Sequence, residues 1–275
     1  MTGRTAHTPA SRVARLVFLV YCAAVFVFLM APIIAIIPLS FNEGSYLTYP
    51  LDGLSLRWYE EVFTTARWVT AMQNSLIVAL PATAIAMIIG TLAAIGLNAT
   101  NFPGKAALGA VLISPMIVPL IITAVGMYLF FAPLGLANSF PGLILAHAAL
   151  GAPFVLVTVS ATLAGYDPTL SRAAASLGAP AHVVFFRVTL PLILPGVASG
   201  ALFAFATSLD EVVVVLFMGG PAQRTLPREI FDGLREHVTP AITAVATLLI
   251  IVATALMLTI EALRRRSERL SGRVN

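Results

Sequence analysis

The chain has 275 residues, of which 59% are hydrophobic and 10% are charged, and its mean hydropathy is +0.95. A soluble domain carries roughly 25% charged residues, so this composition excludes an ordinary water-soluble domain and predicts that much of the surface faces lipid. The formal net charge is +4, and the basic residues lie in short segments beside apolar runs, which indicates membrane orientation rather than nucleic-acid binding.

Six apolar spans follow one another along the chain. Their expected bounds are Leu16–Leu39, Ser75–Leu97, Ala106–Leu134, Phe140–Leu163, Pro191–Met218 and Ala241–Leu263. Each span is long enough to cross roughly 30 Å of hydrocarbon at about 1.5 Å per helical residue. Most contain proline, which membrane helices tolerate where a neighbouring helix or a cavity satisfies the freed backbone groups. The pattern predicts an all-α membrane protein whose six helices pack into a bundle around a pathway.

Arg12 and Arg15 precede the first span, as basic residues precede a signal peptide. The apolar run of that span is much longer than the roughly 7–15 residues of a signal peptide, and no small-x-small cleavage site follows it. We therefore expect a retained helix.

The distribution of basic residues predicts the orientation of the spans. With the N-terminus inside, eleven of the sixteen basic residues fall on the inner side: Arg4, Arg12, Arg15, Lys105, Arg172, Arg187, Arg264, Arg265, Arg266, Arg269 and Arg273. The other five basic residues fall outside: Arg57, Arg67, Arg224, Arg228 and Arg235. The same outside loops contain seven acidic residues. Because positive residues are retained on the cytoplasmic side, both termini are expected in the cytoplasm.

The longest outer connection, residues 40–74, contains the stretch SLRWYEEVF at 55–63. Its apolar and aromatic spacing predicts a short interfacial helix with aromatic side chains at the headgroup level, and a simple surface cap is the alternative.

The inner loop at 171–196 reads SRAAASLGAPAHVVFFRVTLPLILPG. Small residues at 173–176 predict a compact helix, which Gly178 ends in a left-handed conformation. Pro180 then opens a second short helix at 181–187, and Leu190 and Pro191 re-enter the membrane. The expected shape is a helix, a tight turn and a second helix, bordered by Arg172, His182 and Arg187.

This loop resembles the signature of inner-membrane permease subunits from binding-protein-dependent ABC importers, which reads EAA, three residues, Gly, nine residues and Ile-x-Leu-Pro. Ala173 and Ala174 match the two alanines, Gly178 matches the glycine, and 188–191 reads VTLP. Arg172 stands where the family usually has Glu, and the sequence leaves open whether this alters coupling. Segments 113–131 and 142–157 also look like this family, and 208–250 resembles its spermidine/putrescine branch.

The resemblance implies a type I ABC importer permease of the bacterial cytoplasmic (inner) membrane. The domain prediction is a cytoplasmic segment at 1–15, a transmembrane permease domain at 16–264 with its coupling loop at about 165–190, and a basic cytoplasmic tail at 265–275. The residues implied to contact the ATPase are Arg172, Ala173, Ala174, Ala175, Ser176, Leu177, Gly178 and Ala179, and those implied to mark re-entry are Leu190 and Pro191.

The implied partners are an ATP-binding cassette ATPase dimer, a second and different permease subunit, a periplasmic or surface-anchored solute-binding protein and the lipid bilayer. A homodimer remains an alternative, and nucleic acid is not an expected partner. The chain has no GxxxxGK[ST] phosphate loop, and no Cys/His cluster with metal spacing. We therefore expect no catalytic residue, metal or cofactor in this chain, with ATP and Mg on the partner ATPase.

Asp210 and Glu211 lie inside the fifth span. Asp210 follows Pro191 by about 28 Å of helix at about 1.5 Å per residue, which places the pair in the outer half of the membrane. Carboxylates there usually face a bundle interior or a watery cavity. As neighbours on a helix they would point about 100° apart, so both reach one pathway only if it is wide or the helix is locally irregular. We expect one or both, Asp210 above all, to guide a cationic solute along the translocation pathway, and a structural anchor is the alternative.

Other functions remain as alternatives. The solute could be an amino-acid derivative, a phosphonate, ferric iron or a sugar. A self-sufficient secondary transporter would usually show internal repeats, and none is clear. A membrane enzyme would bring several polar groups together, whereas His147 is here interpreted as a hydrogen-bonded bundle residue.

Overall fold

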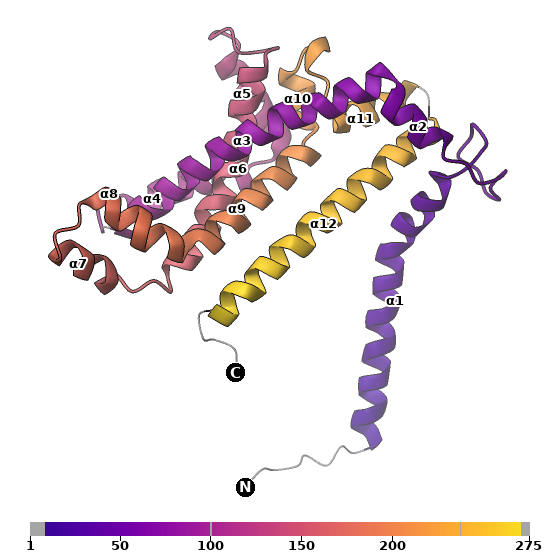
Figure 1. The fold of residues 1–275 in the computed structure, drawn as a ribbon. Coiled ribbons are helices and arrows are strands. Elements are labelled where there is room, and N and C mark those ends of the chain that lie inside the picture. The colour runs from indigo at the N-terminus through magenta and orange to yellow at the C-terminus, as the bar shows by residue number, and fades with distance from the viewer. Residues whose placement is uncertain (1–8, 100, 237, 271–275) are drawn as a thin grey trace. The chain divides into compact units, whose positions relative to one another are not determined.

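The computed structural model describes residues 9–99, 101–236 and 238–270, and Figure 1 shows that its regular elements are helices. These residues form two compact units, one from residues 9–62 with 238–247 and the other from 63–236 with 248–270. The parts of the predicted terminal segments at 1–8 and 271–275 lie outside the described residues.

Among the described residues, five helical stretches are long and apolar enough to span a membrane, and a bent helix pair makes six if it counts as one span. The five lie within α1 (Pro9–Leu39), α3 (Ala66–Ala99), α6 (Phe140–Leu163), the helix from Ala181 to Asp210 and α12 (Pro240–Leu270). The prediction of an all-α membrane protein is confirmed. The bounds of α6 match the predicted fourth span. The helix α3 begins at Ala66, and the predicted span began only at Ser75 because polar residues interrupt the apolar pattern in the first turns of this helix.

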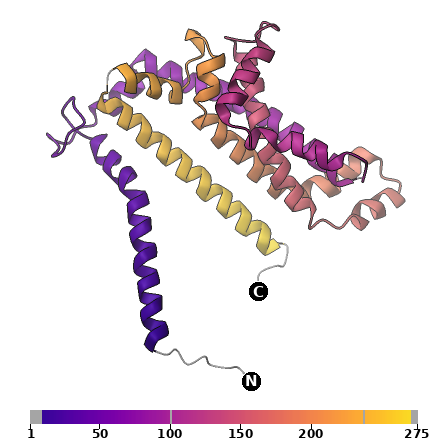
Figure 2. The same ribbon diagram turned by 180° about the vertical axis from the view of Figure 1, so that it is seen from behind.

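The second unit is built around α3, α6 and α9 (Leu190–Asp210), which lie side by side in Figures 1 and 2. Glycine makes this close packing possible. A Cβ atom at Gly90 would lie 2.6 Å from Val155 Cβ, and one at Gly200 would lie 2.7 Å from Val155 Cα. Small residues let membrane helices approach closely and gain van der Waals contact. Val155 is fully buried at the centre of this three-helix packing.

The predicted third span is not a straight helix. It consists of α4 (Lys105–Ile113), the 3-10 turn Ser114–Met116 and α5 (Leu120–Phe131), and the chain bends by 103° at the break. Pro115 and Pro119 explain the break, because proline removes an amide donor and disfavours helical backbone in the residue before it. This pair is either a broken span or a re-entrant segment.

In the first unit, α2 (Arg57–Thr64) confirms the predicted short helix. Its Trp58 is buried instead of lying at the surface, and the indole Nε1 donates a hydrogen bond of 2.7 Å to the carbonyl of Asn42. The Arg57 guanidinium covers the Trp58 ring at 4.3 Å. The helix is therefore fixed to the connection that precedes it, while Phe63 on its other face is exposed.

The remaining elements of the second unit are short. They are α7 (Thr169–Ser176), α8 (Ala181–Val184), the π-helical turn Phe185–Thr189, α10 (Val213–Met218), the 3-10 turn Pro221–Gln223 and α11 (Leu226–Glu236). They lie towards the two ends of α9, where the residues singled out by the sequence also lie.

Candidate coupling loop and acidic turn

We call the N-terminal end of α9 the inner end and its C-terminal end the outer end, after the orientation predicted from the basic residues. The loop at the inner end begins with α7, and none of the residues in α7 is buried. Its first turn is stabilised by Asp167, whose carboxylate accepts a hydrogen bond of 2.9 Å from the Thr169 amide. This bond lowers the pKa of Asp167 below its usual value. The small residues 173–176 therefore form a short helix that is capped at its start and open to contact.

Gly178 ends α7 as predicted, with a left-handed φ of 83°. The Gly178 amide donates to the carbonyl of Ala175 at 2.9 Å, and the Ala179 amide donates to that of Ala174 at 3.2 Å. Glycine adopts this conformation without the steric cost that a Cβ atom imposes. The hydrogen bonds close the helix and turn the chain sharply towards Pro180.

The second predicted helix begins at Ala181 as expected, but it does not stop before the membrane span. The chain stays helical from Ala181 to Asp210, through a π-helical turn at 185–189. The second short helix predicted at 181–187 is therefore the start of a longer one, and entry of the chain into the membrane at Leu190 and Pro191 stays a prediction. Pro191 lies in the first turn of α9, and the wider π-helical turn lets the helix continue towards it.

The residues predicted to contact an ATPase form an accessible surface. Leu177 is 89% exposed, and Ala174 and Ala179 are half-buried. The other members of the set are exposed: Arg172, Ala173, Ala175, Ser176 and Gly178. Of the two residues predicted to mark re-entry, Leu190 is half-buried and Pro191 is exposed. An apolar side chain as exposed as Leu177, beside small residues, suits contact with another protein.

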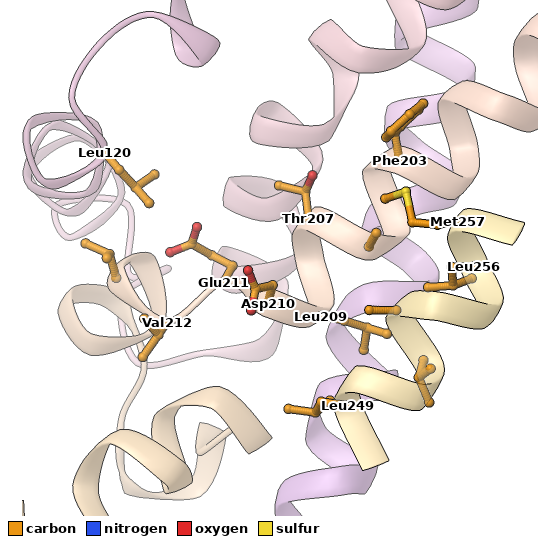
Figure 3. Close-up of a pocket in the computed structure, with 14 residues that line it drawn as sticks. Leu120, Phe203, Thr207, Leu209, Asp210, Glu211, Val212, Leu249, Leu256 and Met257 are labelled. Carbon is orange, nitrogen blue, oxygen red and sulfur yellow. The ribbon is translucent and has the colours of Figure 1, made fainter. Parts of the chain in front are cut away.

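At the outer end of α9 the two acidic residues separate. Asp210 is the last residue of the helix, and Glu211 has extended backbone with φ of −74° and ψ of 117°. The expectation that both side chains project from one helix about 100° apart is therefore wrong, since the helix stops between them. Figure 3 shows Glu211 directed towards Leu120, away from Asp210.

Glu211 is 5% exposed, and its carboxylate has a structural partner. Oε1 accepts a hydrogen bond of 2.8 Å from the Val214 amide, in the first turn of α10. A carboxylate at this position satisfies a free amide and complements the positive end of the helix. Asp210, in contrast, is exposed.

The other end of α10 is held by Arg228 of α11. Its Nη1 donates to the carbonyls of Val215 at 3.1 Å and Gly219 at 2.6 Å. A cation at the end of a helix complements its negative pole. This six-residue helix, which packs Val214, Val215 and Met218 into the core, is thus fastened by an acid at one end and a base at the other.

A cavity of about 480 Å³ lies beside the acidic turn (Figure 3). Asp210 and Glu211 line it together with Phe203 and Thr207 of α9. Its far wall consists of apolar residues of α12, including Leu256 and Met257. The cavity therefore combines an apolar wall with an exposed carboxylate.

His147 of α6 is buried, and its Nδ1 lies 2.7 Å from Ser208 Oγ of α9. The prediction of a hydrogen-bonded bundle residue is confirmed. Because Ser208 is two residues before Asp210, this bond fixes the last turn of α9 next to the acidic residues.

An ion-pair network that the sequence did not reveal links α11 to α3. Glu229 of α11 is 1% exposed, pairs with Arg67 of α3 and lies 3.7 Å from Arg224 Nη1. Asn74 Nδ2 donates to the carbonyls of Ala222 and Arg224, both at 2.9 Å. The network ties the segment after α10 to α3. Helical periodicity could not indicate it, because the residues of α3 lie more than 145 residues from their partners in the sequence.

Comparison with solved structures identifies the fold. The chain resembles a bacterial ABC transporter involved in the import of the acidic polysaccharide alginate, with a TM-score of 0.73, 16% identity and coverage of 94% of this chain and 98% of the other. It also resembles an amino acid ABC transporter crystallised with histidines, with a TM-score of 0.55, 16% identity and coverage of 76% and 98%. The fold is that of an ABC importer permease.

Residues 86–270 match the family described as the binding-protein-dependent transport system inner membrane component, and the chain belongs to that family. It is 36% identical to the spermidine/putrescine transport system permease protein PotC of Haemophilus influenzae, over 88% of this chain and 94% of the relative. It is also 36% identical to the putrescine transport system permease protein PotI of Escherichia coli strain K12, over 82% of each. The protein is thus a multi-pass permease component of an ABC importer.

Proposed function

We propose that this permease forms half of the translocation pathway for a polyamine, spermidine or putrescine, and that Asp210 guides the cationic solute. Relatives that cover most of the chain carry these solutes in their names. The single observation that carries the proposal is the exposed Asp210 carboxylate on a largely apolar cavity.

The chemistry of the cavity fits a linear aliphatic amine. An ammonium group gains from a carboxylate in a site with little water, and a methylene chain gains from apolar contact. The wall formed by Leu249, Leu256 and Met257 offers a sugar few hydrogen-bond partners, and two carboxylates nearby disfavour an anionic phosphonate. Since Glu211 is engaged at the start of α10, Asp210 is the carboxylate available to the solute.

ATP hydrolysis on a separate ATPase dimer drives the cycle in this proposal. α7 docks in a groove of the ATPase, and closure of the dimer rocks the bundle between inward-facing and outward-facing states. ATP and Mg bind the partner, and the second half of the pathway comes from a second permease subunit. A solute-binding protein delivers the polyamine from outside, and both termini lie in the cytoplasm. The exposed small-residue surface of α7 and Leu177 supports the docking step.

The test of the solute uses the complete transporter in proteoliposomes with labelled spermidine and putrescine. Asp210→Asn removes the charge and keeps the shape, and we expect at least a tenfold fall in uptake at low solute concentration. Glu211→Gln keeps an oxygen that can accept from the Val214 amide, and Glu236→Gln removes an exposed acid at the end of α11. Both should retain most uptake. Unchanged uptake in Asp210→Asn would reject the guiding role.

The test of docking uses cysteine at Ala174 or Ala175, on α7. In native membranes, a crosslinker should join either cysteine to an ATPase subunit. A cysteine at Val27, an exposed residue in the middle of α1, is the matched control and should not crosslink to the ATPase. Absence of any ATPase crosslink from α7 would overturn the docking step.

A further inference from the structure

A hollow of about 440 Å³ is lined by residues of α7 and of the helical segment 181–189 that follows it. Its walls include the small or apolar residues Ala175, Ala181, Val184 and Phe185. Arg172 also lines the hollow, and it carries the only full charge among the described residues that do so. The hollow is therefore a small, largely apolar recess with a guanidinium in its lining.

Among the described residues, none forms an ion pair within 4.0 Å with Arg172. The ion pairs of up to 4.0 Å among the described residues involve Arg67, Arg224 and Arg228, all at the outer end. Asp167 of the same loop interacts electrostatically with Arg172, but its carboxylate accepts a hydrogen bond from the Thr169 amide. A guanidinium offers five donors in a planar fork that suits a carboxylate, so Arg172 is available for a charged partner.

We propose that the partner ATPase inserts an apolar side chain into this hollow, with a neighbouring Asp or Glu that pairs with Arg172. The inference rests on the proposed docking of α7 and adds the chemistry of the partner surface. The apolar walls match an apolar protrusion, and the cation in the lining selects an acidic neighbour over a basic one. Leu177 does not line the hollow and is 89% exposed, and in this proposal it enters an apolar pocket of the same partner.

The experiment measures binding of the purified partner ATPase to the permease complex in nanodiscs made of phosphatidylcholine, and separately in nanodiscs with added phosphatidylglycerol. Arg172→Glu should weaken binding at least tenfold, and Arg172→Lys should weaken it less because one charge remains without the planar fork. The matched control is Arg187→Glu, because Arg187 is exposed on the same loop but does not line the hollow. It should stay within about twofold of the wild type.

A charge reversal then identifies the partner residue. Each acidic residue of the ATPase groove is replaced in turn by Lys, and one of these variants should restore binding to Arg172→Glu while weakening binding to the wild type. The Ala174 crosslink is measured for every permease variant, because it reports docking independently of the charge.

The outcomes separate the two proposals. A persistent crosslink with unchanged affinity in Arg172→Glu overturns the ion pair and leaves docking intact. An equal loss in Arg187→Glu, or the failure of every reversal to restore binding, also overturns the pair. A loss seen only with phosphatidylglycerol assigns Arg172 to lipid headgroups instead. Absence of both the crosslink and ATPase binding in the wild type overturns the docking step itself.

Discussion

The two ends of α9 differ in how many of their side chains are buried or hydrogen-bonded to other parts of the chain. At the outer end, Glu211 and Arg228 fasten α10, and His147 bonds to Ser208. At the inner end, α7 has no buried residue and Leu177 is almost fully exposed. One helix thus joins a region whose side chains are bonded to other elements to a region whose side chains are mostly exposed.

This difference indicates where partners act. Side chains that are bonded within the fold hold its shape, whereas accessible side chains without such bonds are available to another molecule. At the outer end Asp210 is the exception, since it is exposed beside groups that are engaged. We infer that the outer end offers one carboxylate to a solute, while the inner end offers a whole surface to a protein.

The largest loss of stability is expected from Gly200→Leu, in the packing that connects the two ends. A Cβ atom at this position would lie 2.7 Å from Val155 Cα, which is backbone and cannot move aside. Overpacking should lower the free energy of unfolding by about 3 kcal/mol, measured by thermal unfolding in mild detergent. Gly109→Ala is the control, because its Cβ atom would meet no atom within 4 Å. Equal melting temperatures in the two variants would contradict the close packing.

Arg228→Gln should have the next largest effect, because it leaves the carbonyls of Val215 and Gly219 without their charged donor. Loss of these bonds should lower the free energy of unfolding by about 2 kcal/mol. Arg235→Gln, in the exposed last turn of the same helix, should change it by less than about 0.5 kcal/mol. If the two variants melt alike, Arg228 does not fasten α10.

Replacement of Glu211 should have a smaller effect that depends on the new side chain. Glu211→Ala removes the acceptor for the Val214 amide and should cost about 1 kcal/mol. Glu211→Gln keeps an acceptor oxygen and should cost less. The same thermal unfolding assay measures both variants. A greater loss of stability in Glu211→Gln than in Glu211→Ala would show that this hydrogen bond does not stabilise the turn.

The smallest effect on stability is expected from Leu177→Ala at the inner end. Because Leu177 is 89% exposed, the isolated permease should unfold within about 0.5 kcal/mol of the wild type. The same variant should lower the ATP hydrolysis of the assembled transporter, since the proposed docking surface loses its apolar side chain. Destabilisation of the isolated chain would mean that Leu177 packs within the fold.

The sequence predicted those features that depend on local patterns. Apolar run length located α6 to the residue, and the glycine at 178 ended α7 with the expected left-handed conformation. Spacing within the loop also identified the family before any fold was known. These features depend on neighbouring residues, so a single sequence contains them.

Features that depend on distant contacts were missed or wrong. The end of α9 between Asp210 and Glu211 follows from the hydrogen bond that Glu211 accepts from the Val214 amide and from the packing of α10. The pairing of Arg67 with the buried Glu229 joins segments that are far apart in sequence. Helical periodicity describes one helix at a time, and it contains no information on which polar groups a second helix will satisfy.

The central claim is that the two ends of α9 have separate tasks, and one measurement tests it directly. ATP hydrolysis and spermidine uptake are recorded together in proteoliposomes that contain the complete transporter with Asp210→Asn or Leu177→Ala. The account predicts that Asp210→Asn raises the KM for spermidine and leaves the ATPase bound, whereas Leu177→Ala lowers hydrolysis and uptake together and leaves the KM unchanged. Identical changes in both variants would contradict it.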